Sequence, residues 1–284
     1  SAIRATARAL IPSAVAAGVN RVVYLSSASV HGQNPPLGCT ELSALSERQE
    51  IEYNNAKVYA ERMLFADARR FGVELFVLRP SIVFGPRDRW LTTLVAELQA
   101  GTAWLIEGGR GICNTIYVDN LIESIRCCLT ASASSSGSAY FVGDDDEITW
   151  GSLYLQASAS LGLDWAAVHQ LPIPPTPKYS TLDLLKKLRV QPASQLLISV
   201  VPSQVKAAVK GAFSGLQPVS DLNPWSLQIP LPAPVPTREM LLLQQCKYSF
   251  PHAKATSELG YSPLFSFAEG LELTLKWLNW ARLV

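Results

Sequence analysis

The sequence has no excess of charge of either sign. It contains 24 Lys and Arg residues against 23 Asp and Glu residues, which gives a net charge of +1 over 284 residues. A nucleic-acid-binding domain normally carries a stripe of basic side chains that neutralises phosphates. The balanced charge therefore argues against a nucleic acid as the partner of this chain.

Long apolar runs are missing as well. A helix that crosses a membrane needs about 18 or more consecutive apolar residues. The longest candidate, residues 195–201, is far shorter and is followed by Pro202, so we expect no membrane span. Hydrophobic residues still make up 48% of the chain and charged residues 17%. This composition indicates a globular protein with one large domain, or with a main domain and a small lobe.

Cysteine and histidine are few, and their spacing does not suit cross-links or metals. The five cysteines are an odd number without a C-x-x-C pair, and the three histidines lie far apart. Disulfide frameworks and zinc sites both need paired or clustered ligands. We therefore expect reduced thiols, a cytoplasmic setting and no metal. The acidic run at residues 144–147 is interpreted as a solvated turn.

Helix and strand patterns alternate along the first part of the chain, which predicts a parallel α/β sheet. A helical pattern ends at Gly18, a buried strand follows at residues 21–26, and residues 47–71 have apolar side chains at helical spacing before Gly72. Further elements are predicted as a strand at 74–78, helices at 88–100, 119–129 and 149–162, two short strands within 102–117 around a hairpin turn at Gly108–Gly111, and a strand at 139–142.

The character of the sequence changes between residues 165 and 245. Proline-rich pieces enclose helical stretches at 181–188 and 203–213, which indicates an inserted lobe and no sheet. We predict an α/β domain over residues 1–164 that includes some segments of the lobe. Residues 165–284 would form a mostly helical, proline-rich substrate lobe and the C-terminal helices.

Tyr53 and Lys57 are the most informative pair. At positions i and i+4 of the predicted helix they share one face. A phenol has an ordinary pKa of about 10, and a neighbouring ammonium stabilises the phenolate, so the pair can serve as a general acid and base. The alternative is an exposed helix face, because this spacing also arises by chance.

Serines stand where the first buried strand ends. Ser26 and Ser27 follow the run at 21–25, at the carboxyl end where open α/β sheets place ligand groups. A hydroxyl there can donate a hydrogen bond to a substrate oxygen, although a simple strand-ending turn is the alternative. The next strand ends in residues 78–86, so the two strand ends and the Tyr53 helix can converge on one crevice.

Four segments carry a family resemblance. The runs VVYLSSASVHG (22–32), YNNAK (53–57), LRPSIVFGP (78–86) and IYVDN (116–120) together resemble the extended short-chain dehydrogenase/reductases, in the NAD-dependent epimerase/dehydratase group. The resemblance covers almost the whole chain and is loose between 165 and 245. It implies a Rossmann-type parallel sheet with a smaller C-terminal substrate lobe and a homodimer formed through the helices at 1–17 and 47–71.

The resemblance also implies NAD or NADP as cofactor and a role for each matching residue. Ser27 would hydrogen-bond the reacting oxygen and Tyr53 would be the acid/base. Lys57 would bind the nicotinamide ribose and lower the pKa of Tyr53. Pro80, Ile82 and Val83 would meet the nicotinamide end of the cofactor.

One part of the family pattern is missing. The glycine-rich phosphate turn that should follow the first strand does not occur, and the sequence opens at Ser1 inside a helical pattern. We therefore expect the first two βα units to be absent, together with the residue that selects NAD or NADP. We also expect that these 284 residues alone do not bind the dinucleotide normally.

The substrate is expected to be apolar. Nucleotide-sugar enzymes of the group often carry Asn near Ile82 or Val83, whereas residues 78–86 look more like the branch with 3β-hydroxysteroid dehydrogenases. The predicted function is NAD(P)-dependent oxidation or reduction of a secondary alcohol or ketone on a small, steroid-like molecule. Candidate pocket residues are Trp90, Trp104, Trp150, Trp165 and Trp225, for which core packing is the alternative. Candidate substrate contacts are His31, Arg87 and Arg89, for which positions in surface loops are the alternative.

Two other functions remain open at this stage. A nucleotide-sugar epimerase or dehydratase would use the same Tyr53 and Lys57. A non-catalytic scaffold on the same fold is the second alternative, and the intact set of Ser27, Tyr53 and Lys57 argues against it.

Overall fold

The structure is a computed structural model and describes residues 2–173 and 233–282. All of these residues except Ile173 belong to one compact unit, which comprises Ser1–Pro172 and Leu231–Val284. The predicted lobe helices at 181–188 and 203–213, and Trp225, lie outside the described residues. Both C-terminal helices belong to the same compact unit as the sheet.

A three-stranded parallel sheet forms the centre of this unit and confirms the α/β prediction. Its strands are β1 (Arg21–Leu25), β2 (Glu74–Pro80) and β6 (Ser138–Val142), in the order β1-β2-β6. Leu25 pairs with Leu78, and Leu78 pairs with Tyr140. Because all pairs are parallel, the carboxyl ends of the three strands lie at one edge of the sheet.

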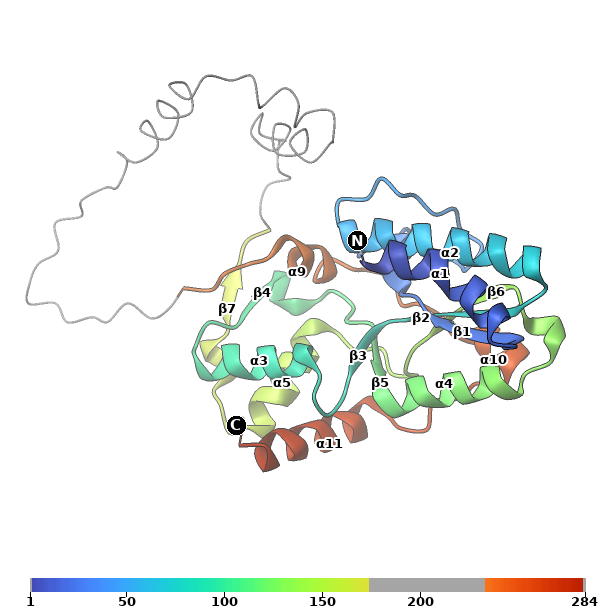
Figure 1. The fold of residues 1–284 in the computed structure, drawn as a ribbon. Helices are drawn as coiled ribbons and strands as arrows, with labels where there is room; N and C mark the ends of the chain where they lie inside the picture. Colours follow the sequence, from blue (N-terminus) through green and yellow to red (C-terminus); the bar gives the residue numbers. More distant parts are fainter. Residues whose placement is uncertain (1, 174–232, 283–284) are drawn as a thin grey trace, which may run out of the picture. The chain divides into compact units, whose positions relative to one another are not determined.

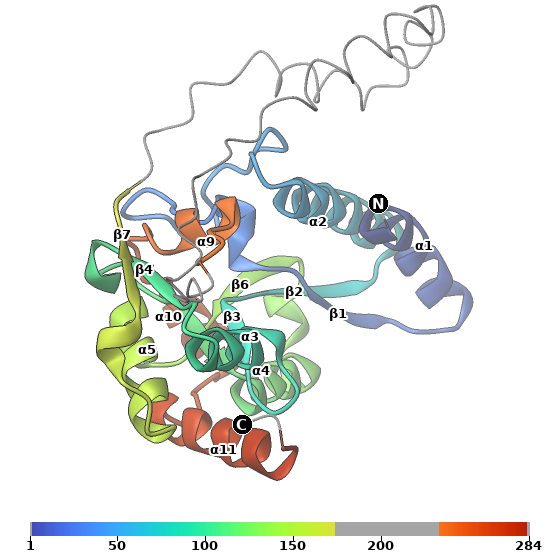
Figure 2. The ribbon, with the colours of Figure 1, turned by 90° about the vertical axis from the view of Figure 1, so that its left-hand side faces the viewer.

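Helices cover both faces of this sheet (Figures 1 and 2). Helices α1 (Ala2–Ala16) and α2 (Glu52–Phe71) lie on one face, and α4 (Val118–Thr130) and α10 (Ala253–Leu259) on the other. In β2, Leu75 and Val77 pack toward α1 and α2, whereas Phe76 and Leu78 pack toward α4 and α10. This alternation follows from the two-residue period of a strand. Burial on both faces explains why residues 75–78 of β2 form an unbroken apolar run.

A second group of elements packs around another core cluster. This group contains two short pairs of parallel strands. One pair is β3 (Ile82–Phe84) with β5 (Thr115–Tyr117), and the other is β4 (Trp104–Ile106) with β7 (His169–Leu171). The helices that enclose them are α3 (Arg89–Gln99), α5 (Trp150–Ser160), α9 (Arg238–Leu243) and α11 (Phe267–Trp280).

Three details of the prediction are wrong. The hairpin at Gly108–Gly111 does not form, because β4 pairs with β7 and β5 pairs with β3. β7 is also a strand in a region where no sheet was expected. The turn serves close packing instead, since a Cβ at Gly109 would lie 2.4 Å from the Gly151 nitrogen.

The helix predicted from residue 47 begins at Glu52. The Asn55 side chain bonds both the N–H and the C=O of Gln49 and holds the preceding chain outside the helix.

The acidic run is also more than a solvated turn. Asp144 accepts hydrogen bonds from the Tyr117 nitrogen and from the Asn120 amide, and Asp146 accepts one from the Phe267 nitrogen. Asn120 in addition contacts the backbone of Leu264 and Phe265. These bonds attach the start of α11 to the β5–α4 corner.

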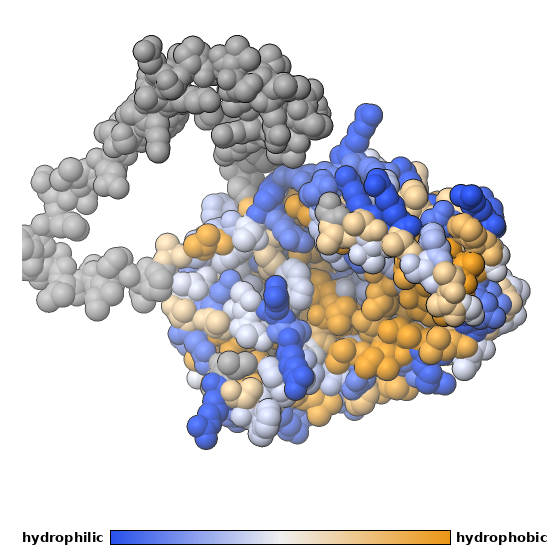
Figure 3. Space-filling model, viewed as in Figure 1, coloured by the Kyte–Doolittle hydropathy of each residue, from blue (hydrophilic) through white to orange (hydrophobic). Residues whose placement is uncertain are grey.

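An apolar surface stays uncovered beside β1. Among the described strands, β1 is paired on one side only. Figure 3 shows apolar side chains over β1 and the neighbouring α4, where Leu25, Ile122 and Leu129 are exposed. In the described parts of the chain no helix reaches the length and hydropathy of a membrane span, and no cluster of side chains suits a metal.

A buried ion pair joins α2 to the sheet. Arg79 of β2 and Glu61 of α2 are 3% and 1% exposed, and two hydrogen bonds of 3.0 and 2.6 Å connect them. The remaining Arg79 nitrogen contacts the Glu41 carbonyl at 2.9 Å and the His31 ring at 3.0 Å. Each of the three guanidinium nitrogens therefore has a hydrogen-bond partner, as a buried charge requires.

We expect Glu61→Ala to destabilise the protein by about 3–5 kcal/mol, because it leaves the Arg79 charge buried and unpaired. Urea unfolding measures the loss. Glu272→Ala is the matched control, since Glu272 forms an exposed pair with Lys276 and such a pair contributes about 0–0.5 kcal/mol. Equal losses in the two variants would contradict the prediction.

Candidate active site

The predicted reacting residues line one cavity at the carboxyl ends of β1 and β2. The cavity has a volume of about 570 Å³. It is lined among others by Ser26, Ser27, Tyr53, Lys57, Pro80, Ile82 and Val83. The structure thus brings together every catalytic and cofactor candidate from the sequence.

The two serines follow β1 directly. Ser26 continues the ladder through its N–H, which donates to the Leu78 carbonyl at 2.7 Å. Its hydroxyl is buried and has no hydrogen-bond partner among the described residues. Ser27 caps the short helix Ala28–His31, with its Oγ accepting from the Ser29 nitrogen. An unpaired buried hydroxyl costs stability, so the Ser26 Oγ marks a position where a bound molecule would find a partner.

Tyr53 and Lys57 face this strand end from the first turns of α2. The Lys57 Nζ donates a hydrogen bond of 2.7 Å to the Leu25 carbonyl. It lies 5.7 Å from the centre of the Tyr53 ring and 5.1 Å from that of Tyr24. The ammonium is therefore held between the end of β1 and the phenol, as the i and i+4 spacing predicted.

The pKa of Tyr53 departs upward from its ordinary value. Burial of the phenol is the main cause and the negative charge of Glu239 adds to it, while the Ser27 hydroxyl opposes it. Burial lowers the pKa of Lys57, and Glu61 opposes that shift. The resemblance implied a lowered phenol pKa. In this structure desolvation and the Glu239 carboxylate raise the pKa of Tyr53, and they outweigh the hydrogen bond with Ser27.

Glu239 is a site residue that the sequence did not indicate. It lies on α9 and lines the same cavity as Tyr53 and Lys57. The helix is fixed by the paired hydrogen bonds of Arg238 to Glu50, at 2.7 and 3.1 Å, and by the Thr237 cap. No local pattern connects positions 53 and 239, because only the tertiary fold brings them together.

A close backbone contact holds the segment after α9. Gly111 packs against Gln244, and a Cβ at Gly111 would lie 1.9 Å from the Gln244 carbonyl oxygen. The Ile112 N–H donates to the Cys246 carbonyl at 2.7 Å, and the Gln244 side chain bonds the backbone of Ile106. Glycine is needed at position 111 for this approach.

An apolar chamber adjoins the first cavity. Its volume is about 240 Å³, and Ile82, Trp90 and Trp150 line both spaces. Trp104 also lines the chamber, whereas Trp165 packs against the surrounding core cluster. The tryptophans that the sequence left undecided thus divide between a pocket wall and the core.

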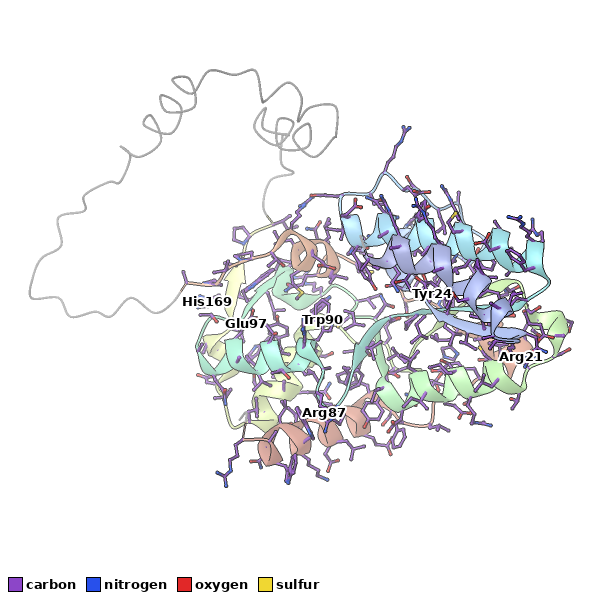
Figure 4. The ribbon with its side chains drawn as sticks, in the orientation of Figure 1. Arg21, Tyr24, Arg87, Trp90, Glu97 and His169 are labelled. Carbon is purple, nitrogen blue, oxygen red and sulfur yellow. The ribbon has the colours of Figure 1, made fainter. Side chains whose placement is uncertain are left out.

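The structure brings neither His31 nor Arg87 to these spaces. The His31 ring contacts Arg79 and lies 5.2 Å from the ring of Phe141. Burial and the Arg79 charge lower the pKa of His31 to about 4. Arg87 has a φ of 72° in the turn before α3, and Figure 4 shows it on the other side of α3 from Trp90.

We expect Gly111→Ala to lower the free energy of unfolding by about 1–3 kcal/mol, because the added methyl group meets backbone that cannot yield. Urea denaturation measures this loss. Gly143→Ala is the control, since its Cβ would find its nearest atoms at 3.5 Å. A loss in the control as large as in Gly111→Ala would count against the close contact.

We expect Glu239→Gln to lower the pKa of Tyr53, because the substitution removes the negative charge that disfavours the phenolate. Titration of ¹³C-labelled tyrosine by NMR follows the phenol, with its signal assigned by comparison with Tyr53→Phe. Glu272→Gln, on the distant face of α11, should leave the titration unchanged. An unaltered Tyr53 pKa in Glu239→Gln would show that Glu239 does not act on the phenol.

Comparison with known proteins agrees with this geometry. Residues 4–143 match the model of the NAD dependent epimerase/dehydratase family. A 3beta-hydroxysteroid-dehydrogenase/decarboxylase of Arabidopsis thaliana is 26% identical over 94% of this chain and 55% of its own length. A 2-alkyl-3-oxoalkanoate reductase of Shewanella oneidensis is 23% identical over 93% of this chain and 61% of its own length. The chain spans about half the length of such curated relatives.

The fold is likewise shared with solved structures. A dTDP-glucose 4,6-dehydratase from Streptomyces venezuelae superimposes with a TM-score of 0.62 and 23% identity, over 97% of this chain and 65% of the other. This likeness confirms the Rossmann-type fold. The match over residues 4–143 and the similar relatives support the NAD dependent epimerase/dehydratase family for this chain, and the solved structure shows its fold.

Proposed function

We propose that the protein is an NAD(P)-dependent oxidoreductase that converts a secondary alcohol and a ketone on an apolar, steroid-like substrate. The observation that carries the proposal is the convergence of Ser27, Tyr53 and Lys57 at one cavity that adjoins an apolar chamber. The printed names of the Arabidopsis and Shewanella relatives, a 3beta-hydroxysteroid dehydrogenase/decarboxylase and an oxoalkanoate reductase, support this reaction type.

The cavity suits the nicotinamide and ribose end of the cofactor. The unpaired Ser26 hydroxyl offers a hydrogen bond, and Lys57 uses one of its three donors on Leu25. Pro80, Ile82 and Val83 supply an apolar wall. When bound, the cofactor supplies or accepts the hydride. The sequence has no G-x-G-x-x-G turn, so the proposal concerns the reacting end of the cofactor alone.

The protein side chains would handle the oxygen of the substrate. The Ser27 hydroxyl donates a hydrogen bond to that oxygen, and the Tyr53 phenol delivers its proton to it when a ketone is reduced. In the reverse direction, the phenolate takes the proton from the alcohol. Because the pKa of Tyr53 is raised, the phenol is protonated at neutral pH, which favours its role as proton donor in reduction.

Epimerisation or dehydration of a nucleotide sugar is the second candidate, because the dehydratase from Streptomyces venezuelae shares the fold. The same three side chains would serve it. The lining favours the first proposal, since the Glu239 carboxylate repels a diphosphate and Ile82 and Val83 offer it no hydrogen bonds. The homodimer through α1 and α2 and the cytoplasmic setting stay predictions.

We expect Tyr53→Phe to lower kcat for a ketosteroid by about 10²–10⁴-fold, because it removes the proton donor. The absorbance of the reduced nicotinamide follows turnover. Tyr59→Phe is the matched control on the same helix; its hydroxyl accepts a hydrogen bond from Arg8 at 2.9 Å outside both cavities. Wild-type turnover by Tyr53→Phe would overturn the proposal and favour a scaffold.

A further inference from the structure

Among the described residues that line the apolar chamber, Glu97 is the one with a carboxylate. Glu97 lies on α3 and lines the chamber together with Leu94, Trp104 and Leu153. Its side chain is half-buried, and no hydrogen bond or ion pair within residues 2–173 and 233–282 uses its carboxylate oxygens. Desolvation of a carboxylate in such surroundings is unfavourable unless a hydrogen-bond partner replaces the lost water.

The burial of Glu97 agrees with a hydrogen-bond acceptor that has no partner in the chamber. Burial raises the pKa of Glu97, and its charge adds to the raised pKa of the buried Tyr154. Tyr154 belongs to α5 and lines the same chamber as Glu97. Arg89 also lines the chamber, but it precedes Glu97 by two turns, about 12 Å along the helix, and no ion pair joins the two.

Glu97 is at the end of the chamber remote from the reacting cavity. Trp90 belongs to the wall that the chamber shares with that cavity. Glu97 follows it by seven residues, which is about 10 Å along α3. Figure 4 shows Trp90 and Glu97 on the same side of the helix, at opposite ends.

We propose that Glu97 is a specificity-determining residue that accepts a hydrogen bond from a hydroxyl at the far end of an elongated apolar substrate. The reacting oxygen of the same molecule would lie at Ser27 and Tyr53. The inference rests on the proposed function and adds the second polar group of the substrate. A hydroxyl bonded to a carboxylate is strongly held, whereas a molecule without that donor leaves the carboxylate unpaired and binds less well.

The test compares two steroids that differ at the far end alone. Androstenediol and dehydroepiandrosterone share the 3β-hydroxyl; the first has a hydroxyl at the remote ring and the second a ketone. Quenching of tryptophan fluorescence reports binding, because Trp90, Trp104 and Trp150 line the chamber. We expect the protein to bind androstenediol about tenfold more tightly than dehydroepiandrosterone.

Variants of Glu97 test whether this residue causes the preference for androstenediol. Glu97→Leu should bind the two steroids equally, since it has no acceptor. Glu97→Gln keeps an amide oxygen and should retain part of the preference. Glu272→Leu, which alters an exposed carboxylate on α11, should behave as wild type and serves as the matched control.

Equal affinity of the wild-type protein for the two steroids, or a preference that survives in Glu97→Leu, would overturn the inference. A preference for the ketone would overturn it too and would indicate that a hydrogen-bond donor, and not the Glu97 carboxylate, governs this end. Each of these outcomes leaves the proposed function standing, because turnover in Tyr53→Phe tests that separately. Binding of neither steroid would overturn the inference and the steroid-like substrate together.

Discussion

The buried ion pair between Arg79 and Glu61 is the constraint on which the site depends. The guanidinium emerges from β2 and meets three other segments: α2 through Glu61, the short helix after β1 through His31, and the loop at Glu41. Ser27 and Tyr53 belong to two of these segments. A single side chain therefore sets the position of the helix with the phenol relative to the strand end with the hydroxyl.

Glu61 also has an electrostatic effect on the site. It follows Lys57 by one helical turn, and its charge opposes the lowering of the Lys57 pKa by burial. Without that charge, desolvation alone would act on the ammonium. The same carboxylate that anchors α2 thus helps to keep Lys57 protonated beside Tyr53, so the architecture and the chemistry of the site share one residue.

The sequence predicted those parts of the fold that local patterns encode. Apolar runs marked β1 and β2, and the i and i+4 spacing placed Tyr53 and Lys57 on one helix face. The contributions of Glu97 and Glu239 were not predictable, because burial of a carboxylate depends on segments far away in the chain. The packing of Gly111 against Gln244 and the pairing of β4 with β7 are long-range contacts of the same kind. Trp104 and Trp165 look alike in sequence, yet Trp104 lines a chamber and Trp165 is partly buried against a core cluster.

The five cysteines provide a means to follow the local unfolding of this protein. All are free thiols, each at most 4% exposed. They occupy separate regions: Cys39 in the loop before α2, Cys113 beside the apolar chamber, Cys127 and Cys128 on α4, and Cys246 after α9. A thiol-alkylating reagent too bulky to enter the two cavities, which Cys113 and Cys246 line, reaches each thiol only when its own region unfolds. The order in which the five thiols become labelled would therefore rank the local stabilities of the fold, without any engineered probe.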